Sequence, residues 1–279
     1  MPNKVPEWLC AGLIVLAGTA ASLAAAAGQE GGNWIALFDG KTLDGWVPKI
    51  RGYALGDNYA DTFRVEDGAI TMSYDGYDEF DGRFGHLFYK IPYSHYRLRF
   101  EYRIYGEPAK GIPDWAFRNS GVMIHSPCPE SMLRDQDFPI SLEFQLLGGR
   151  GDGKPRPTGN LCTPGTNVVY DGHFEETHCI DSSAPTFGGD DWIKAEILVL
   201  GDEKIVHYIN GKEVLEYERP TYGGGAVSGH DPTLFRDGQP LTGGYISLQA
   251  EGHPVQFRNI ELMNLDAASK GRDLYCPGK

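Results

Sequence analysis

The sequence predicts an all-β fold in which two antiparallel sheets pack face to face, as a sandwich or jelly roll. Short runs in which apolar and polar residues alternate recur along most of the chain, and no helical periodicity persists beyond a few turns. The 37 glycines and 18 prolines punctuate these runs. Many short strands separated by turns are typical of two packed sheets, each with one face toward the core and one toward water.

The first predicted strands follow an Asp-Gly turn. Residues 68–74 begin directly at that turn, and residues 95–106 have an apolar residue at every second position with Arg or Glu between. Residues 120–126 alternate in the same way and carry His125 on the polar side. A period of two residues indicates a strand with one buried face.

The next run, residues 139–149, reads PISLEFQLLGG. Leucine and phenylalanine alternate here with Ser141, Glu143 and Gln145, so one face is apolar and the other carries a carboxylate and an amide. Strands that simply face water more often carry Thr, Lys or Ser on that side. Glu143 and Gln145 are therefore candidate functional residues.

The last predicted strands complete the two sheets. Residues 191–201 alternate, and residues 204–217 hold an Asn-Gly pair between two apolar runs, which is the strongest short hairpin signal in the chain. Residues 243–252 place glutamine and glutamate opposite isoleucine, leucine and alanine, and residues 255–265 close the domain.

Residues 1–27 are predicted to be a secretory signal peptide. Lys4 gives a weakly basic start, the stretch from Leu9 to Ala27 is almost entirely apolar or small, and Ala-x-Ala cleavage choices follow. An uncleaved anchor helix is the alternative, because the apolar run approaches the roughly 20 residues that span a bilayer. We expect an exported protein, periplasmic or extracellular, with no integral membrane association after cleavage.

Residues 28–266 are predicted to form a single jelly-roll domain, followed by a C-terminal tail, residues 267–279. One all-β domain can be this long. Its two long loops, 148–166 and 222–244, exceed the length at which loops are often functional. The net charge of −13 argues against a nucleic-acid partner, which needs a basic surface.

Four cysteines remain once the signal segment is removed. An even number of cysteines in an exported protein predicts structural disulfides. Sequence alone leaves all three ways of forming two pairs open. The four are Cys128, Cys162, Cys179 and Cys276.

Polar residues opposite the apolar faces of several strands form a candidate site. If their strands share one sheet, these residues line a groove of carboxylates, amides and an imidazole, which suits the hydroxyls of a sugar. Asn119 and the aromatic rings of Trp115 and Phe117, just before the 120–126 strand, can add a polar group and a plane for a sugar ring. The outward residues are His125, Glu143, Gln145, Lys194, Glu196, Gln249 and Glu251.

Five motifs resemble the 3-keto-disaccharide hydrolase family. In order they are WIALFDGKTLDGW, NSGVMIHS, LEFQLLGG, DWIKAEILVLGDEKIVHYINGKEV and GGYISLQAEGHPVQFRNIELMNL, and together they span about residues 34–265. The resemblance implies a concanavalin A-like jelly roll and action on glycosides oxidised at C3. It also implies pocket roles for Glu143, Gln145, Glu251 and His253. The chain departs from the family pattern where LQAEGHP has Ala-Glu in place of a common Asp-His pair, and where His125 replaces a frequent Arg.

The implied substrate calls for a particular set of groups. A ketone at C3 acidifies the C2–H, so cleavage by elimination and hydration needs a base near C2, an acid near the glycosidic oxygen, and positive charge or a metal at the enolate oxygen. Glu143 is the candidate base. His125 or His253 is the candidate acid or metal ligand. Lys194 or Arg258 is the candidate group for the enolate.

Several alternatives stay open at this point. A direct glycosidase needs two carboxylates flanking the bond, and Glu143 and Glu251 are such a pair only if their strands are neighbours. A non-catalytic carbohydrate-binding module, or a structural domain of the cell envelope, could use the same fold. No cofactor is certain. A metal site is possible at two places. A divalent metal could bind His125, Glu143 and His253, or calcium could bind the acidic loop 75–81.

Overall fold

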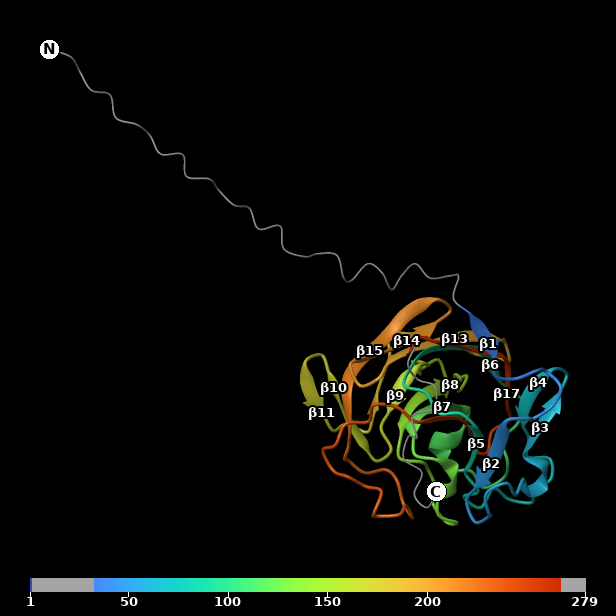
Figure 1. Cartoon of the computed structure of the whole chain (residues 1–279). Coiled ribbons are helices and arrows are strands. Elements are labelled where there is room, and N and C mark those ends of the chain that lie inside the picture. Colours follow the sequence, from blue (N-terminus) through green and yellow to red (C-terminus); the bar gives the residue numbers. More distant parts are fainter. Residues whose placement is uncertain (2–32, 267–279) are drawn as a thin grey trace. The chain divides into compact units, whose positions relative to one another are not determined.

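The computed structural model describes Met1 and residues 33–266, and the latter form two antiparallel sheets packed face to face (Figure 1). The predicted signal peptide beyond Met1 and the predicted tail lie outside the described residues. Three short 3₁₀ helices join the strands within residues 33–266: η1 (Tyr59–Asp61), η2 (Asp114–Ala116) and η3 (Pro129–Ser131). The all-β sandwich expected from the alternation is confirmed.

One sheet has ten strands. Its order is β11 (His173–Glu175), β10 (Thr166–Tyr170), β15 (Lys212–Tyr222), β14 (Lys204–Ile209), β13 (Ile193–Leu200), β6 (His95–Ile104), β17 (Val255–Asn264), β4 (Ala69–Met72) and β3 (Phe63–Glu66), with β1 (Trp34–Ala36) also paired to β17. The predicted Asn210-Gly211 hairpin joins β14 and β15. Figure 1 shows β10 and β11 at one end of this sheet and β3 and β4 at the other.

The other sheet has seven strands. Its order is β12 (Cys179–Ile180), β9 (Asn160–Cys162), β8 (Leu142–Leu147), β7 (Asn119–Ser126), β16 (Tyr245–Ala250), β5 (Gly85–Tyr89) and β2 (Trp46–Ile50). Strands β7, β8 and β16 are therefore neighbours although about 100 residues separate β8 from β16 in the sequence. Only β7 therefore separates β8, which contains the LEFQ motif, from β16, which contains the SLQA motif.

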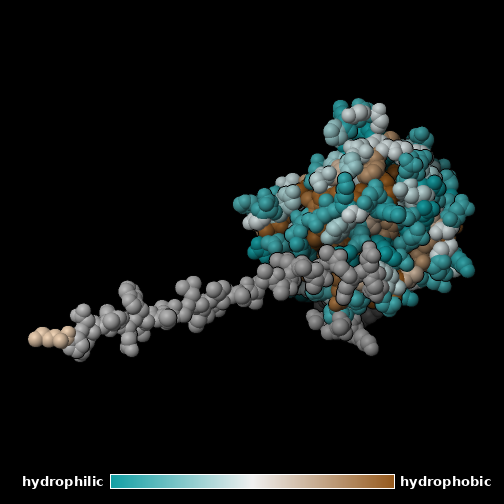
Figure 2. Space-filling model, turned by 90° about the horizontal axis from the view of Figure 1, so that it is seen from above, coloured by the Kyte–Doolittle hydropathy of each residue, from teal (hydrophilic) through white to brown (hydrophobic). Residues whose placement is uncertain are grey.

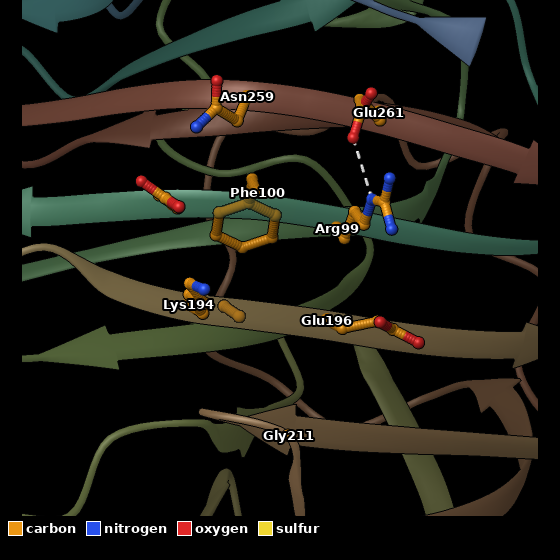
Figure 3. A pocket seen from close by; sticks show the side chains of 9 residues that line it. Arg99, Phe100, Lys194, Glu196, Gly211, Asn259 and Glu261 are labelled. Carbon is orange, nitrogen blue, oxygen red and sulfur yellow. Dashed lines mark hydrogen bonds and ion pairs between the residues drawn. The ribbon is translucent and has the colours of Figure 1, made fainter. Parts of the chain in front are cut away.

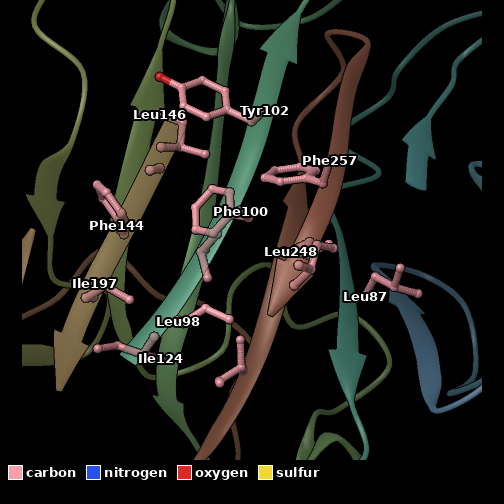
Figure 4. Packing of buried hydrophobic residues seen from close by; sticks show 14 of the residues in the cluster. Leu87, Leu98, Phe100, Tyr102, Ile124, Phe144, Leu146, Ile197, Leu248 and Phe257 are labelled. Atoms are coloured by element: carbon pink, nitrogen blue, oxygen red, sulfur yellow. The ribbon is translucent and has the colours of Figure 1, made fainter. Parts of the chain in front are cut away.

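The facing sides of the two sheets share one core (Figure 4). The ring of Phe100 on β6 lies 6.1 Å from that of Phe144 on β8 and 5.8 Å from that of Phe257 on β17, centroid to centroid. All three side chains are at most 2% exposed. Complete burial of such a ring contributes about 1.5–3 kcal/mol each. The apolar faces of β6 and β8 thus meet across the sandwich.

The polar residues do not share one sheet, which corrects an expectation from the sequence. Lys194 and Glu196 belong to β13 of the ten-stranded sheet, whereas Glu143 and Gln145 belong to β8 of the seven-stranded sheet. Alternation shows which side chains point away from the core, but it does not show which of the two sheets a strand joins. The residues expected to line a single groove therefore lie on the outer faces of both sheets.

The exterior is mainly hydrophilic, with hydrophobic residues in small patches between polar ones on the face that Figure 2 shows. Scattered apolar residues of this kind are normal on a soluble surface. Among the described residues, no helix has the length and apolar character needed to cross a bilayer.

Candidate functional site

A pocket of about 720 Å³ contains the polar face of the LEFQ strand. Glu143 and Gln145 of β8, Cys162 of β9 and Cys179 of β12 lie on one side of it, and Glu251, just after β16, also lines it. Both long loops contribute. Their residues in the lining are Arg150, Arg156, Cys162, Pro164, Ala226, Val227 and Ser228.

A glycine on the intervening strand lets two polar side chains meet. Gly121 of β7 pairs with Gln145 of β8 in the sheet. A Cβ on Gly121 would lie 2.6 Å from Oε1 of Glu143 and 3.0 Å from Oε1 of Gln249. The carboxyl of Glu143 and the amide of Gln249 therefore occupy the space above Gly121, one from each neighbouring strand. Any larger residue at 121 would collide with the carboxyl.

Glu143 is almost completely buried although it lines the pocket. It is 6% exposed, and burial raises its pKa from 4.5 to about 8, while the neighbouring Gln249 amide lowers it somewhat. Its Oε1 has no hydrogen-bond partner. A carboxyl in this state is a strong base once ionised, because little in its surroundings stabilises the negative charge.

Glu251 is the second buried carboxyl of the pocket and is 2% exposed. Burial raises its pKa well above the usual value, the negative charge of Glu143 raises it further, and the positive charge of Arg156 opposes both. Two carboxyls that influence one another in a buried site do not both ionise easily, so the pair holds a proton at neutral pH.

The chain turns sharply directly after Glu251. Gly252 has φ of +96°, and a Cβ there would collide with the side chain of Ile112. Its N–H donates to the Tyr74 hydroxyl oxygen at 2.7 Å. The Glu-Gly step thus ends β16 where its carboxyl can reach the pocket, a local arrangement that only glycine permits.

Aromatic rings form one wall of the pocket. Trp115 on η2 is 48% exposed, and its indole stacks on Phe84 at 5.5 Å between centroids. Phe138, 5.0 Å from the same Phe84 ring, continues the wall. Asn119 lies beside it, where its buried Oδ1 has no hydrogen-bond partner. An exposed indole beside an amide oxygen that lacks a hydrogen-bond partner can hold a sugar ring by its face and one of its hydroxyls.

A disulfide joins two strands of the pocket lining. Cys162 and Cys179 pair across β9 and β12 with a Cα separation of 4.1 Å, and Cys162 is also the strand partner of Glu143. One of the pairings left open by the sequence is therefore settled, while Cys276 lies outside the described residues. The disulfide ties the edge of the sheet next to Glu143.

The pocket gathers five of the nine residues selected from the sequence. Glu143, Gln145, Glu251, Asn119 and Trp115 all line it. Gln249 lies behind Glu143 at Gly121 rather than in the lining. The sequence missed the arginines and Phe138, and it predicted disulfides without placing one in the pocket lining. The only signal for the arginines was their position in one of the two long loops.

Three selected residues lie elsewhere, and the expectation that they share the pocket was wrong. His125 adjoins a separate pocket of about 190 Å³, and its Nε2 donates to the Gly201 carbonyl at 2.9 Å. His253 is buried with its ring edge against Phe117, 5.2 Å away. Lys194 lines a depression of about 400 Å³ on the ten-stranded sheet with Arg99, Glu196 and Glu261 (Figure 3).

Neither of the two buried histidines lines the pocket that holds Glu143. Backbone φ of His125 is +58°, so β7 bends out of regular pairing beyond its contact with β8. His253 follows the turn at Gly252, in the loop between β16 and β17, and the positive charges of Arg118 and Arg156 act on its imidazole. Burial lowers the pKa of both imidazoles to about 4, so both are neutral at neutral pH.

The metal sites expected from the sequence do not form. Among the described residues, the cluster of potential ligand atoms close enough for one ion is Cys162, His178 and Cys179, and its two sulfurs form the disulfide. In the acidic loop 75–81, Asp75 pairs with Arg64 at 2.7 Å and Glu79 with Lys110 at 2.8 Å.

Known proteins resemble this chain over most of its length. Residues 33–263 match the family described as 3-keto-alpha-glucoside-1,2-lyase-like domain. The 3-keto-disaccharide hydrolase of Bacteroides thetaiotaomicron is 28% identical over 255 residues, covering 84% of this chain and 79% of that protein.

Solved structures resemble it as well. A candidate glycosyl hydrolase from Parabacteroides distasonis is 20% identical, with a TM-score of 0.50, over 84% of this chain and all of that one. A Bacillus subtilis protein of unknown function with a galectin-like fold has a TM-score of 0.48 and 10% identity, over 80% of this chain and 90% of that one. The first likeness shows a shared fold.

Proposed function

Since the chain belongs to the family of 3-keto-alpha-glucoside-1,2-lyase-like domains, we propose that it cleaves glycosides oxidised at C3, by elimination followed by hydration. The observation that carries the proposal is the pair of buried carboxyls, Glu143 and Glu251, that line one pocket. Glu143 is the base and Glu251 the acid. The pKa of Glu251 is raised both by burial and by the charge of its partner, which favours its protonated form.

The proposed elimination uses both groups once. The Glu143 carboxylate takes the proton from C2, and the electron pair moves onto the C3 oxygen as an enolate. The pair then returns to form the C1–C2 double bond as the C1–O bond breaks. Glu251 gives its proton to the departing glycosidic oxygen, which leaves as an alcohol. The product is an enone of the sugar ring.

Hydration completes a net hydrolysis. Water adds at C1 of the enone, and C2 takes a proton from Glu143. The oxygen of the water loses its proton to Glu251, so both carboxyls return to their starting states. The remaining product is the free 3-keto sugar.

The walls of the pocket suit a neutral sugar. Trp115 offers an exposed aromatic face, while Asn119 and Gln145 offer amide groups from β7 and β8. Sugar rings stack their C–H faces on aromatic planes and pair their hydroxyls with amides. A pocket of about 720 Å³ lies within the range usual for small-molecule sites.

We further propose that the protein acts outside the cytoplasm, in the periplasm or the medium, after cleavage near residue 27. The apolar N-terminal segment supports this. The disulfide between Cys162 and Cys179 supports it too, because such bonds persist in oxidising compartments.

The test is product release from matched pairs of glycosides. Wild type and Glu143→Gln would each be incubated with a 3-keto glycoside and with its unoxidised parent, with and without a chelator. We expect wild type to release sugar only from the 3-keto compound, chelator or not, and the variant to release none while still binding. Cleavage of the parent would indicate direct hydrolysis by the two carboxyls. Binding without turnover by wild type would indicate a carbohydrate-binding module.

A further inference from the structure

The proposed elimination puts negative charge on the C3 oxygen, and the cations expected there from the sequence do not face the pocket. Arg258 pairs with Glu101 at 2.8 Å and lies 3.9 Å from the Trp192 ring centre, on the ten-stranded sheet. Lys194 lies on that sheet too. The pocket instead contains two arginines, Arg150 and Arg156.

Arg150 is already occupied by a carboxylate. Its Nη1 donates to Oδ1 of Asp114 at 2.9 Å, and its Nη2 donates to Oδ2 of the same residue at 3.1 Å. Nη2 also donates to the Asp114 carbonyl at 2.6 Å. A fork-to-fork pair of this kind neutralises the guanidinium and fixes it to η2.

Arg156 is oriented without being neutralised. Its Nη1 donates to the carbonyl oxygens of Gly148 at 2.6 Å and Arg118 at 3.3 Å, and its Nη2 donates to that of Trp115 at 3.3 Å. A guanidinium has five N–H donors, so these three bonds leave two. Carbonyl groups hold the plane of the side chain in place but carry no net charge to cancel its own.

Two glycines after β8 make this placement possible. A Cβ on Gly148 would lie 2.7 Å from Nε of Arg118, and one on Gly149 would lie 2.9 Å from Cγ2 of Thr186. The backbone N–H of Arg156 donates to the Thr186 hydroxyl at 2.6 Å. Both the main chain and the side chain of Arg156 are thus anchored, which is the preorganisation that electrostatic catalysis requires.

The charge of Arg156 acts within the pocket. Burial, and then the charge of Arg150, lowers its pKa to about 10, so the guanidinium remains positive at neutral pH. Its field already opposes the raised pKa of Glu251. A fixed positive charge in a partly dehydrated pocket stabilises a developing anion far more than it would in water.

We infer that Arg156 is a catalytic residue that donates hydrogen bonds to the C3 oxygen of the substrate and stabilises it as the enolate. The inference rests on the proposed function. The electron pair released from the C2–H bond resides on that oxygen while the proton is on Glu143. It leaves the oxygen when the C1–O bond breaks, so Arg156 exchanges no proton and forms no covalent bond.

Deuterium exchange isolates the step in which Arg156 acts. A 3-keto sugar without a leaving group, 1,5-anhydro-3-ketoglucitol, can lose its C2 proton but cannot release an alcohol from C1. NMR in D2O then reports enolisation alone. Arg156→Gln keeps an amide that can donate to Gly148 but removes the charge, Arg156→Lys restores a charge, and Arg258→Gln is the control on the other sheet.

We expect Arg156→Gln to slow C2 exchange, and kcat for the 3-keto glycoside, by about 100-fold or more, the usual effect of removing one oxyanion donor. KM should change less than about threefold, Arg156→Lys should recover part of the rate, and Arg258→Gln should match wild type. Exchange by Arg156→Gln within threefold of wild type, or a loss confined to KM, would overturn the inference. If Arg156→Gln does not fold, measurable exchange by Arg156→Lys with the wild-type pH profile supports charge as the requirement, and complete loss of exchange in folded Arg156→Lys overturns it. Absence of exchange and cleavage by wild type would instead reject the proposed function itself.

Discussion

Replacing Gly121 with alanine tests whether Glu143 really lies across β7 toward β16. The added Cβ would meet Oε1 of Glu143 at 2.6 Å and its Cγ at 2.8 Å. Both distances are shorter than atoms tolerate, so the buried Glu143 side chain would have to shift. Forcing extra volume into a packed site usually costs about 1–3 kcal/mol.

The sign of the change in stability is informative, because replacing a glycine in a regular strand with alanine normally stabilises a protein. Without a clash, Gly→Ala stabilises a protein by about 0.4–1 kcal/mol through the unfolded chain. We expect a net loss of about 1–2 kcal/mol, and in a domain of this size each kcal/mol lowers Tm by about 2–4 °C. Gly188→Ala is a matched control, since a Cβ there would meet nothing within 4 Å.

A double-mutant cycle assigns the loss to the carboxyl. Thermal unfolding would be followed for Gly121→Ala, Glu143→Ala and the double variant. Because Glu143→Ala removes the two closest atoms and leaves only Oε1 of Gln249 at 3.0 Å, Gly121→Ala should cost much less in that background, giving a coupling of about 1 kcal/mol or more. An equal loss of stability in both backgrounds would refute the placement of Glu143 over Gly121.

Other consequences follow from the same geometry. Glu143→Gln should raise Tm more at pH 8 than at pH 5. The folded-state pKa of Glu143 is about 8 instead of 4.5, so ionising this carboxyl destabilises the wild type increasingly as the pH rises between those two values. An equal gain in Tm at both pH values would contradict this. Replacing Cys162 and Cys179 with serine should cost about 3 kcal/mol in thermal or urea unfolding, as for a loop of some 15 residues. Trp115→Ala should raise KM at least about fivefold with kcat within about threefold, if stacking on its face binds the sugar. Lys194→Ala should leave kcat/KM unchanged, because Lys194 lies on the other sheet.

The fold was predictable from the sequence because a hydrophobic pattern with a period of two residues places apolar side chains on one face of each strand, and those faces form the core. Residues such as Phe100 and Phe144, placed on apolar faces by alternation, do meet in the core. The Asn210-Gly211 hairpin was also correct, since its turn chemistry is local. Alternation holds no information on strand order, which explains why Lys194 was assigned to the wrong face.

The candidate site was predictable only in part, for a related reason. Glu143, Gln145 and Glu251 were found because a carboxylate or amide is unusual opposite a strongly apolar strand face. Arg156 lies in a loop without periodicity, and its position depends on carbonyl contacts to Gly148, Arg118 and Trp115. His125 was misassigned because a positive φ near the end of its strand is invisible in a pattern of alternating residues.

Carbon-detected NMR of the glutamate side chains measures directly whether the two buried carboxyls of the pocket, Glu143 and Glu251, hold at least one proton at neutral pH. A pH titration of protein labelled with ¹³C in the glutamate carboxyls would be compared with the same titration of Glu143→Gln. The account predicts a resonance that titrates near pH 8 in wild type and disappears in the variant. A wild-type protein in which every glutamate carboxyl titrates below about pH 5, the ordinary range, would contradict it.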